Sequence, residues 1–239
     1  MVETWRVPTG GGSRRFSAPR EVAIGLGVYA AYLLVRHLAL RGAGEQQAES
    51  NAQRIVALER RLGIHLEPQM QQFVLPHRRF VNALNLAYAT LNVGLTVAWL
   101  MRLFHRRDPQ FHLYRRAAVL AVLGAQPAFL FFPVAPPRKL EHLVDTIADV
   151  SGVDLDTGLV SKLYHPLAAM PSIHVTIAVV TADGIRATSR SAWALRLIPA
   201  YPPIVAAVVF VTANHYVLDA VAGSALGRAA LRLARRLER

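Results

Sequence analysis

The sequence predicts an all-α membrane protein with six transmembrane helices and one amphipathic helix in the membrane interface. Of its 239 residues, 53% are hydrophobic and only 18% are charged, which is a low charged fraction for a soluble domain. The net charge is nevertheless +12, and the basic residues cluster between long apolar runs. This distribution is typical of a polytopic membrane protein and argues against a nucleic-acid-binding groove. We therefore expect the chain to bind the membrane and no nucleic acid.

The chain divides into two predicted regions. Residues 1–19 contain a Gly-Gly-Gly run and several arginines, which predicts a flexible basic tail. Residues 20–239 form a single membrane domain. The chain has no cysteine, which excludes disulfides, thiolate nucleophiles and cysteine metal sites. Because no cluster of carboxylates indicates a divalent metal either, we expect neither a metal nor a cofactor.

Six apolar segments follow the tail. A helix needs about 20 residues to cross the core of a bilayer, and the first five segments approach or reach that length. The sixth is shorter and less apolar. The six segments are Val22–Leu40, Phe80–Met101, Ala117–Ala135, Pro171–Ala187, Leu197–Ala213 and Tyr216–Leu231.

Arginine placement orients these segments. The tail, the turns after the second and fourth segments, and the C-terminal end are rich in arginine, so the positive-inside bias places them in the cytoplasm. The loop over residues 136–169 carries more acidic than basic residues and is placed outside. Both termini are then cytoplasmic, which requires an even number of spans and supports the weak sixth. We expect a multi-pass protein of the plasma membrane.

The external stretch over residues 41–79 departs from this bias because it is rich in arginine. Within it, Ile55, Leu58 and Leu62 recur at helical spacing. This pattern predicts an amphipathic helix over Glu45–Leu62 that lies in the interface, where its arginines would meet lipid phosphates. A solvated helix over the outer loop fits the same pattern.

The start of the sixth segment carries candidate catalytic residues. His215 and Asp219 are four residues apart, so a helix places their side chains on one face. The carboxylate can accept a hydrogen bond from one imidazole nitrogen and leave the other free to attack. If this pair stood alone, a simpler interpretation would apply: the histidine lies at the membrane interface and the aspartate pairs with an arginine. A second histidine in the same setting changes that balance.

This second histidine, His174, lies in the first turn of the fourth segment, after a Met-Pro-Ser start typical of a helix N-terminus. Arg138 follows the third segment. The topology therefore places two histidines, a carboxylate and an arginine at the outer surface, beside two helix N-termini that favour anions. This set fits phosphoryl transfer: an arginine holds phosphate oxygens, one histidine attacks phosphorus and the other protonates the leaving oxygen. A chance convergence of interfacial residues is the alternative.

The motifs resemble those of a known family. Met-Pro-Ser-Ile-His at 170–174 and Asn-His-Tyr-Val-Leu-Asp at 214–219 resemble the second and third motifs of the type 2 phosphatidic acid phosphatase superfamily. They are closest to its inositol phosphorylceramide synthase-like branch, which includes many actinobacterial membrane proteins. Ala-Pro-Pro-Arg at 135–138 resembles that branch's first motif, and the resemblance covers residues 20–230.

This resemblance implies a role for each motif residue. His215 would be the nucleophile that forms a phosphohistidine, and Asp219 would orient it. His174 would be the general acid, and Arg138 would bind phosphate.

The chain also departs from the phosphatases of that superfamily. Their first motif has a lysine seven residues before the arginine, where this chain has Phe131, and a proline after it, where this chain has Lys139. They also carry an arginine five or six residues before the nucleophile, where this chain has Phe210 and Val209. Ile173 replaces a glycine of the second motif. Two phosphate-binding cations are thus absent from their usual positions.

Other polar residues are candidates to complete the site. Lys139 and Ser172 join Arg138 as candidate phosphate ligands, and Lys162 is a further compensating cation. Polar residues within a membrane are often functional, although hydrogen bonding between helices explains them equally well. The candidates for a substrate or acceptor site are Asn85, Tyr88, Asn92, Asn214 and Tyr216.

We therefore expect an integral membrane enzyme that moves a phospho-headgroup or phosphoryl group from a lipid donor through a phosphohistidine at the extracytoplasmic face. One alternative is a phosphatase for lipid phosphate monoesters from the same superfamily. Another is a non-enzymatic lipid transporter, which needs no nucleophile.

Overall fold

The computed structural model describes residues 16–41, 44–140, 143–152 and 165–239. Most of the predicted tail, and Lys162, lie outside this set. Within the described residues the fold is all-helical and contains no β-strand beyond one isolated bridge between Val134 and Ala168. The prediction of an all-α fold is confirmed.

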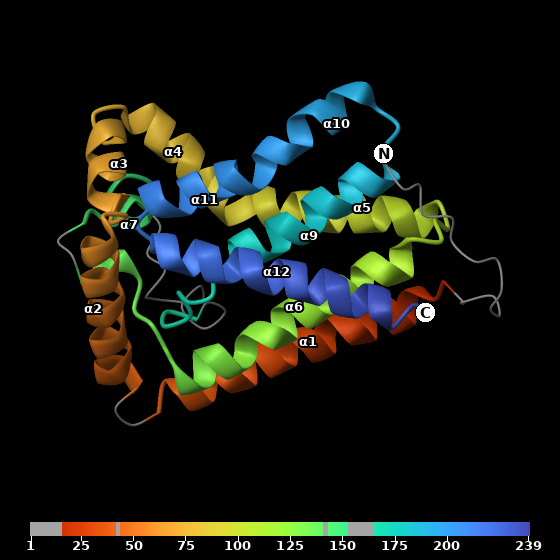
Figure 1. Ribbon diagram of the computed structural model, residues 1–239, viewed down its shortest axis with the longest axis horizontal. Helices are drawn as coiled ribbons and strands as arrows, with labels where there is room; N and C mark the ends of the chain where they lie inside the picture. The colour runs from red at the N-terminus through yellow and green to blue at the C-terminus, as the bar shows by residue number, and fades with distance from the viewer. Residues whose placement is uncertain (1–15, 42–43, 141–142, 153–164) are drawn as a thin grey trace.

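Long helical rods run side by side through the molecule (Figure 1). Each predicted apolar segment lies largely on one of them, and two rods are interrupted by a short π- or 3-10 turn. The rods are α1 (Ala18–Ala39), α4 (Arg78–Leu86) with η1 (Ala87–Leu91) and α5 (Asn92–His105), α6 (Phe111–Phe131), α9 (Ile173–Thr188), α10 (Ala192–Leu197) with η3 (Ile198–Ala200) and α11 (Tyr201–Val211), and α12 (Val217–Arg236).

Two helices, Ala18–Ala39 and Ala192–Val211, are long and apolar enough to cross a membrane. The pair Arg78–Thr90 and Asn92–His105 is bent by 44° and makes a third if it is one span. The other rods fall short because α9 has only 16 residues and because arginines occupy the first turns of α6 and the last turns of α12. The apolar helices indicate a membrane protein, and the count of six spans stays a prediction.

The close approach of α9 and α12 sets the positions of the two histidine motifs. A Cβ atom at Gly223 would lie 2.5 Å from the carbonyl oxygen of Ser172, and one at Gly227 would lie 2.8 Å from that of Thr176. Only glycine allows two helix backbones to come this near. The hydroxyl of Thr176 also donates to the Gly223 carbonyl at 3.0 Å. The start of α9 is therefore held directly against the start of α12.

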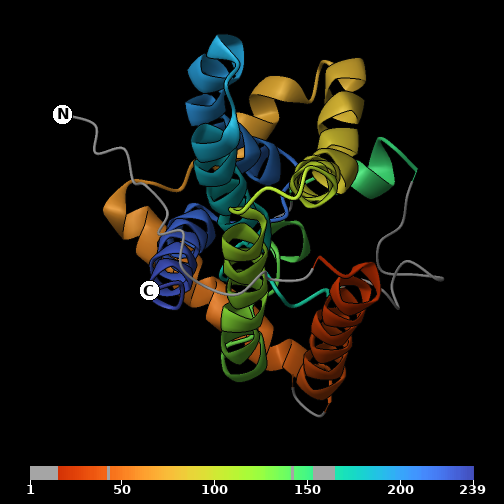
Figure 2. The same ribbon diagram turned by 90° about the vertical axis from the view of Figure 1, so that its right-hand side faces the viewer.

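A helical cap covers the end of the bundle where α9 and α12 begin. Its main part is α2 (Gly44–Leu62), which crosses the rods (Figures 1 and 2). The short helices α3 (Glu67–Val74), α7 (Thr146–Asp149) and η2 (Pro137–Lys139) lie at the same end. The C-terminus lies at the opposite end (Figure 1).

The helix predicted over Glu45–Leu62 is present as α2, and its placement in the membrane interface stays a prediction. Ile55 is buried, whereas Leu58 and Leu62 are exposed. The buried stripe of α2 consists of alanines, two β-branched apolar residues, an asparagine and a glutamate. This stripe comprises Ala48, Asn51, Ala52, Ile55, Val56 and Glu59.

Candidate active site

The two histidines predicted to act together lie edge to face at the capped end of the bundle. Their ring centroids are 5.8 Å apart. His174 is in the first turn of α9, whose N-cap Ser172 accepts a hydrogen bond from the backbone N–H of Val175. His215 immediately precedes the N-cap of α12. The backbone N–H of Ser172 donates to the carbonyl of Asp219 at 3.0 Å, so the two helix starts are joined directly.

His215 has two acceptors at one ring nitrogen. Its Nδ1 lies 2.8 Å from the carbonyl oxygen of Ala169 and 3.4 Å from Oδ2 of Asp219. A carbonyl oxygen only accepts, so Nδ1 carries the proton and Nε2 keeps its lone pair. The sequence pointed to Asp219 as the partner but not to Ala169, because a backbone carbonyl leaves no signature in residue type.

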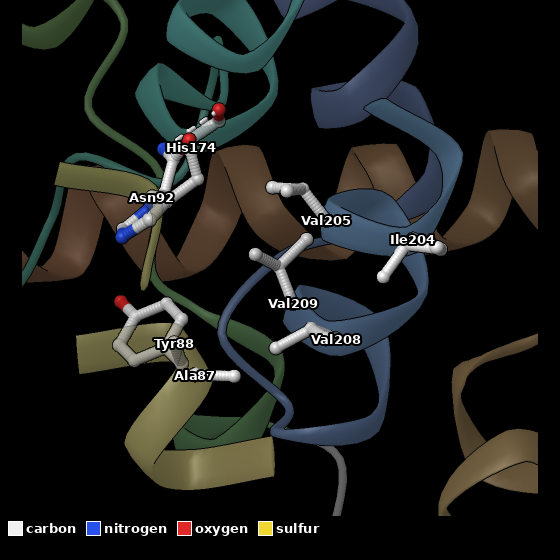
Figure 3. A pocket seen from close by; sticks show the side chains of 8 residues that line it. All are labelled: Ala87, Tyr88, Asn92, His174, Ile204, Val205, Val208 and Val209. Carbon is white, nitrogen blue, oxygen red and sulfur yellow. Dashed lines mark hydrogen bonds between the residues drawn. The ribbon is translucent and has the colours of Figure 1, made fainter. Parts of the chain in front are cut away.

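His174 lies between aromatic and amide side chains of the second rod. Its ring stacks on that of Tyr88 with centroids 4.4 Å apart. The Nδ2 of Asn92 donates to the His174 carbonyl at 3.0 Å, and its Oδ1 accepts from the Tyr201 hydroxyl at 2.7 Å. A small apolar pocket lies beside His174, Tyr88 and Asn92, and helix α11 forms its opposite wall (Figure 3). It is lined by Ala87, Tyr88, Asn92, His174, Ile204, Val205, Val208 and Val209.

A larger cavity of about 430 Å³ shares Tyr88, Asn92 and His174 with the small pocket. Both His174 and His215 line it, and most of its remaining wall is apolar. Helix α1 supplies Val28, Tyr29 and Tyr32 to this wall. Such a volume, apolar with a few convergent polar groups, is typical of a ligand site.

The described part of the outer loop contributes His165 to the same cavity. Burial, assisted by the charge of Arg36, lowers the pKa of His165 to about 4. His165 is therefore neutral at neutral pH and does not supply a missing cation.

Arg138 is buried on η2 and contacts Asn214, the residue that precedes the candidate nucleophile. Its Nη1 donates to Oδ1 of Asn214, and its Nε lies 3.0 Å from Oδ2 of Asp145. Asn214 also donates to the carbonyl and the hydroxyl of Thr212. The structure thus brings Arg138 next to the third motif through Asn214, whereas Lys139 is exposed. Asp145, missed by the sequence reasoning, also caps α7.

The five candidates for a substrate or acceptor site separate into two groups. Tyr88, Asn92 and Asn214 line the larger cavity, whereas Tyr216 is buried in an apolar cluster of the cap. Asn85 instead hydrogen bonds to Thr146 and Ser151. A regular α-helix would put Asn85 on the same face as Asn92. The π-helical turn η1 and the bend at this point turn Asn85 toward α7.

Two buried glutamates of the cap were not singled out from the sequence. Glu59 on α2 and Glu67 on α3 are fully buried at the start of α12. Together with His65 they offer three ligand atoms within 4.8 Å of one another, which is the spacing of a metal site. The sequence showed no such cluster, because the turn between α2 and α3 brings the two glutamates together. In the sequence, each glutamate looks like an ordinary partner for the nearby arginines, because neither has another carboxylate at helical spacing.

A family model described as the PAP2 superfamily matches residues 53–233, from within α2 to near the end of α12. The matched region contains both histidines and Arg138. No curated protein and no solved structure matches the chain.

Proposed function

The chain belongs to the PAP2 superfamily, and we propose that it is an integral membrane enzyme that transfers a phospho-headgroup or phosphoryl group from a lipid donor through a phosphohistidine. One observation carries this proposal: His174 and His215 face the same apolar cavity, with the Nδ1 of His215 already engaged by acceptors. A nucleophile and a proton donor thus meet at the wall of a space suited to a lipid.

In the proposed first step, Nε2 of His215 attacks phosphorus and the bond from phosphorus to the leaving oxygen breaks. His174 protonates that oxygen, so the leaving group departs as a neutral alcohol or acid. The positive charge that develops on His215 is stabilised by Asp219 and by the Ala169 carbonyl. In the second step His174 takes a proton from the acceptor hydroxyl, whose oxygen attacks phosphorus and releases His215.

Arg138 is the proposed ligand for phosphate oxygens, because its guanidinium donates to Asn214, the residue that precedes the proposed nucleophile, and pairs with Asp145. Lys139 and Ser172 remain the further candidates. Ser172 lies at the N-terminus of α9, where backbone N–H groups favour an anion.

The absence of cations at two usual positions favours a donor with low charge. The positions that carry the superfamily's other cations are apolar here: Val209 and Phe210 are buried, and Phe131 is exposed at the end of α6. A phosphate monoester carries nearly two negative charges at neutral pH and a diester carries one. Each charge-assisted hydrogen bond contributes roughly 1.5–3 kcal/mol, so a site with fewer cations disfavours the monoester. We therefore propose a phosphodiester lipid as donor.

We further propose that the site faces the outside of the plasma membrane. The histidines lie at the capped end, whereas the arginine-rich ends of α5 and α12 lie at the other end (Figure 1). With the arginines in the cytoplasm, both termini are cytoplasmic and the cap is external.

The experiment incubates purified protein with a phosphodiester lipid, a lipid pyrophosphate or phosphatidic acid, each with and without polyol and glycolipid acceptors. Mass spectrometry identifies the products, and His215→Ala is the control. We expect a headgroup-transfer product that depends on the acceptor. Release of inorganic phosphate from phosphatidic acid, unaffected by any acceptor, would assign the chain as a phosphatase. Lipid movement without phosphate chemistry would favour a transporter.

A further inference from the structure

The start of α12 is held by carboxylates in an unusual way. The first backbone N–H groups of a helix have no acceptor within the helix itself. Three successive backbone N–H groups each donate to a carboxylate here. They belong to the N-cap residue and to the first two residues of α12. The N–H of Tyr216 donates to Oδ2 of Asp219 at 2.9 Å, that of Val217 to Oε1 of Glu67 at 2.7 Å, and that of Leu218 to Oε1 of Glu59 at 2.7 Å.

All three carboxylates are completely buried. Burying an ionisable group is unfavourable unless it is well paired, and apolar residues of similar size often serve stability equally well. Two of these groups belong to the cap, which contributes neither candidate catalytic histidine. Their common feature is that Glu59 and Glu67 contact residues 217 and 218, between the candidate nucleophile His215 and its partner Asp219.

The first turn of α12 also fixes the geometry of the site. It carries Asp219, whose Oδ2 lies 3.4 Å from Nδ1 of His215 and whose carbonyl accepts the N–H of Ser172 at the start of α9. A shift of this turn would therefore move the two histidines relative to each other. Misplacement of a reacting group by about 1 Å is enough to lower a rate by about 100-fold.

We propose that Glu59 and Glu67 are positioning residues, which bind the first turn of α12 and thereby hold His215 and Asp219 in register with His174. This proposal rests on the proposed function of that site. The glutamates touch no reacting atom and act through the helix.

One carboxylate oxygen of each glutamate accepts from α12, and the other oxygen faces His65. Nδ1 of His65 lies 3.1 Å from Oε2 of Glu67 and 3.5 Å from Oε2 of Glu59. Burial, followed by the nearby charges of Glu67 and Asp219, raises the pKa of Glu59 to about 8. Burial also raises the pKa of Glu67. A protonated carboxyl still accepts at its carbonyl oxygen, so glutamine, which keeps this oxygen, is a suitable replacement.

The first test removes the acceptor. Glu59→Ala and Glu67→Ala are each expected to lower kcat by about 10- to 100-fold, with KM changed less than about 3-fold. Glu59→Gln and Glu67→Gln are expected to stay within about 3-fold of the wild type. Glu49→Ala, which changes an exposed glutamate of α2, is the matched control.

The second test removes the donor and leaves both glutamates in place. Val217 is the first residue of α12, where proline is well tolerated, and Tyr216 before it has the extended conformation that proline requires. Val217→Pro deletes the N–H that binds Glu67, and Val217→Ala retains it. We expect Val217→Pro to match Glu67→Ala. The combined variant should lose no more activity than either change alone, because both remove one interaction.

A third measurement does not depend on turnover. In nitrogen-15 spectra of the histidine side chains, the resonance assigned to His215 should move in Glu67→Ala and Val217→Pro and stay in place in Glu67→Gln. If the variants show this pattern of shifts but the wild type has no activity on any lipid, the proposed function fails and the positioning role stands. Full activity in both Ala variants would overturn the positioning role. A folded Gln variant as inactive as its Ala counterpart would do so too, because charge would then be the requirement.

Discussion

The Nδ1 atom of His215 is closer to the carbonyl oxygen of Ala169, at 2.8 Å, than to the carboxylate of Asp219, at 3.4 Å. The backbone carbonyl alone is enough to fix the tautomer in which Nε2 is free. Asp219 caps α12, and under the proposed mechanism it serves mainly to stabilise the charge that forms on His215.

We therefore expect substitution of His215 to lower activity more than substitution of Asp219. His215→Ala should abolish turnover. Asp219→Asn should lower kcat by only about 10- to 100-fold, which is less than the roughly 10,000-fold loss seen where the aspartate alone sets the tautomer. Steady-state kinetics with the lipid donor measure both values. If Asp219→Asn were as inactive as His215→Ala, the Ala169 carbonyl would not be holding the ring.

The role assigned to His174 predicts a dependence on the leaving group. His174→Ala should block turnover of a lipid whose leaving alcohol needs a proton. A p-nitrophenyl phosphodiester needs no such proton, so its hydrolysis should be partly restored in His174→Ala but not in His215→Ala. Release of p-nitrophenol is followed by absorbance. Equal recovery in both variants would exclude the proposed roles.

The proposed topology is open to labelling, because the chain contains no native cysteine. Asp149→Cys places a thiol at an exposed position of the cap, and Arg106→Cys places one at an exposed position of the opposite end. In intact cells an impermeant maleimide should label the first variant and leave the second unlabelled until the membrane is opened. Labelling in the reverse order would place the site in the cytoplasm.

The buried carboxyl of Glu59 predicts how stability changes with pH. Its pKa is raised from 4.5 to about 8, so the folded state holds a proton that the unfolded state has already released in this interval. The stabilisation is fully present below about pH 4.5 and is lost as the pH rises toward 8. The melting temperature of the wild type should therefore fall more between pH 5 and 8.5 than that of Glu59→Gln. Glu67, His65 and Asp219 are common to both proteins, so parallel curves would contradict the assignment.

Removal of metal should leave activity unchanged. The proposed reaction uses a histidine nucleophile, and Glu59 and Glu67 direct one carboxylate oxygen each to the N–H groups of α12. Turnover is measured before and after dialysis against a chelator, with metal content followed by mass spectrometry. Loss of activity that a divalent cation restores would assign the cluster of Glu59, His65 and Glu67 to a metal.

The sequence was most informative where function depends on side chains at short spacing. His174, His215 and Asp219 were identified because each lies at the start of an apolar helix, and helix starts at one end of a bundle come together. Arg138 was placed by the same reasoning. The helical fold was predicted from the long apolar segments, whereas the number of membrane spans also depends on arginine placement and stays a prediction.

Other features could not be predicted because they arise from packing. The Ala169 carbonyl is a backbone group, and the pairing of Glu59 with Glu67 depends on how α2 and α3 fold over α12. Hydrophobicity alone does not reveal that a glutamate lies on the face of α2 that packs on the bundle. A π-helical turn, which leaves no strong sequence pattern, separates Asn85 from the cavity.

The wall of the larger cavity includes residues that lie outside the region matched by the superfamily model. Helix α1 forms part of its wall through Val28, Tyr29 and Tyr32, and this helix precedes the region that matches the superfamily, residues 53–233. The histidines belong to α9 and to the segment before α12. Under the proposed function, part of the surface that contacts a hydrocarbon chain thus lies outside the matched region, whereas both histidines lie within it. Substitutions in α1 can change which lipids are accepted while the chemistry is preserved, so the two properties are free to evolve independently.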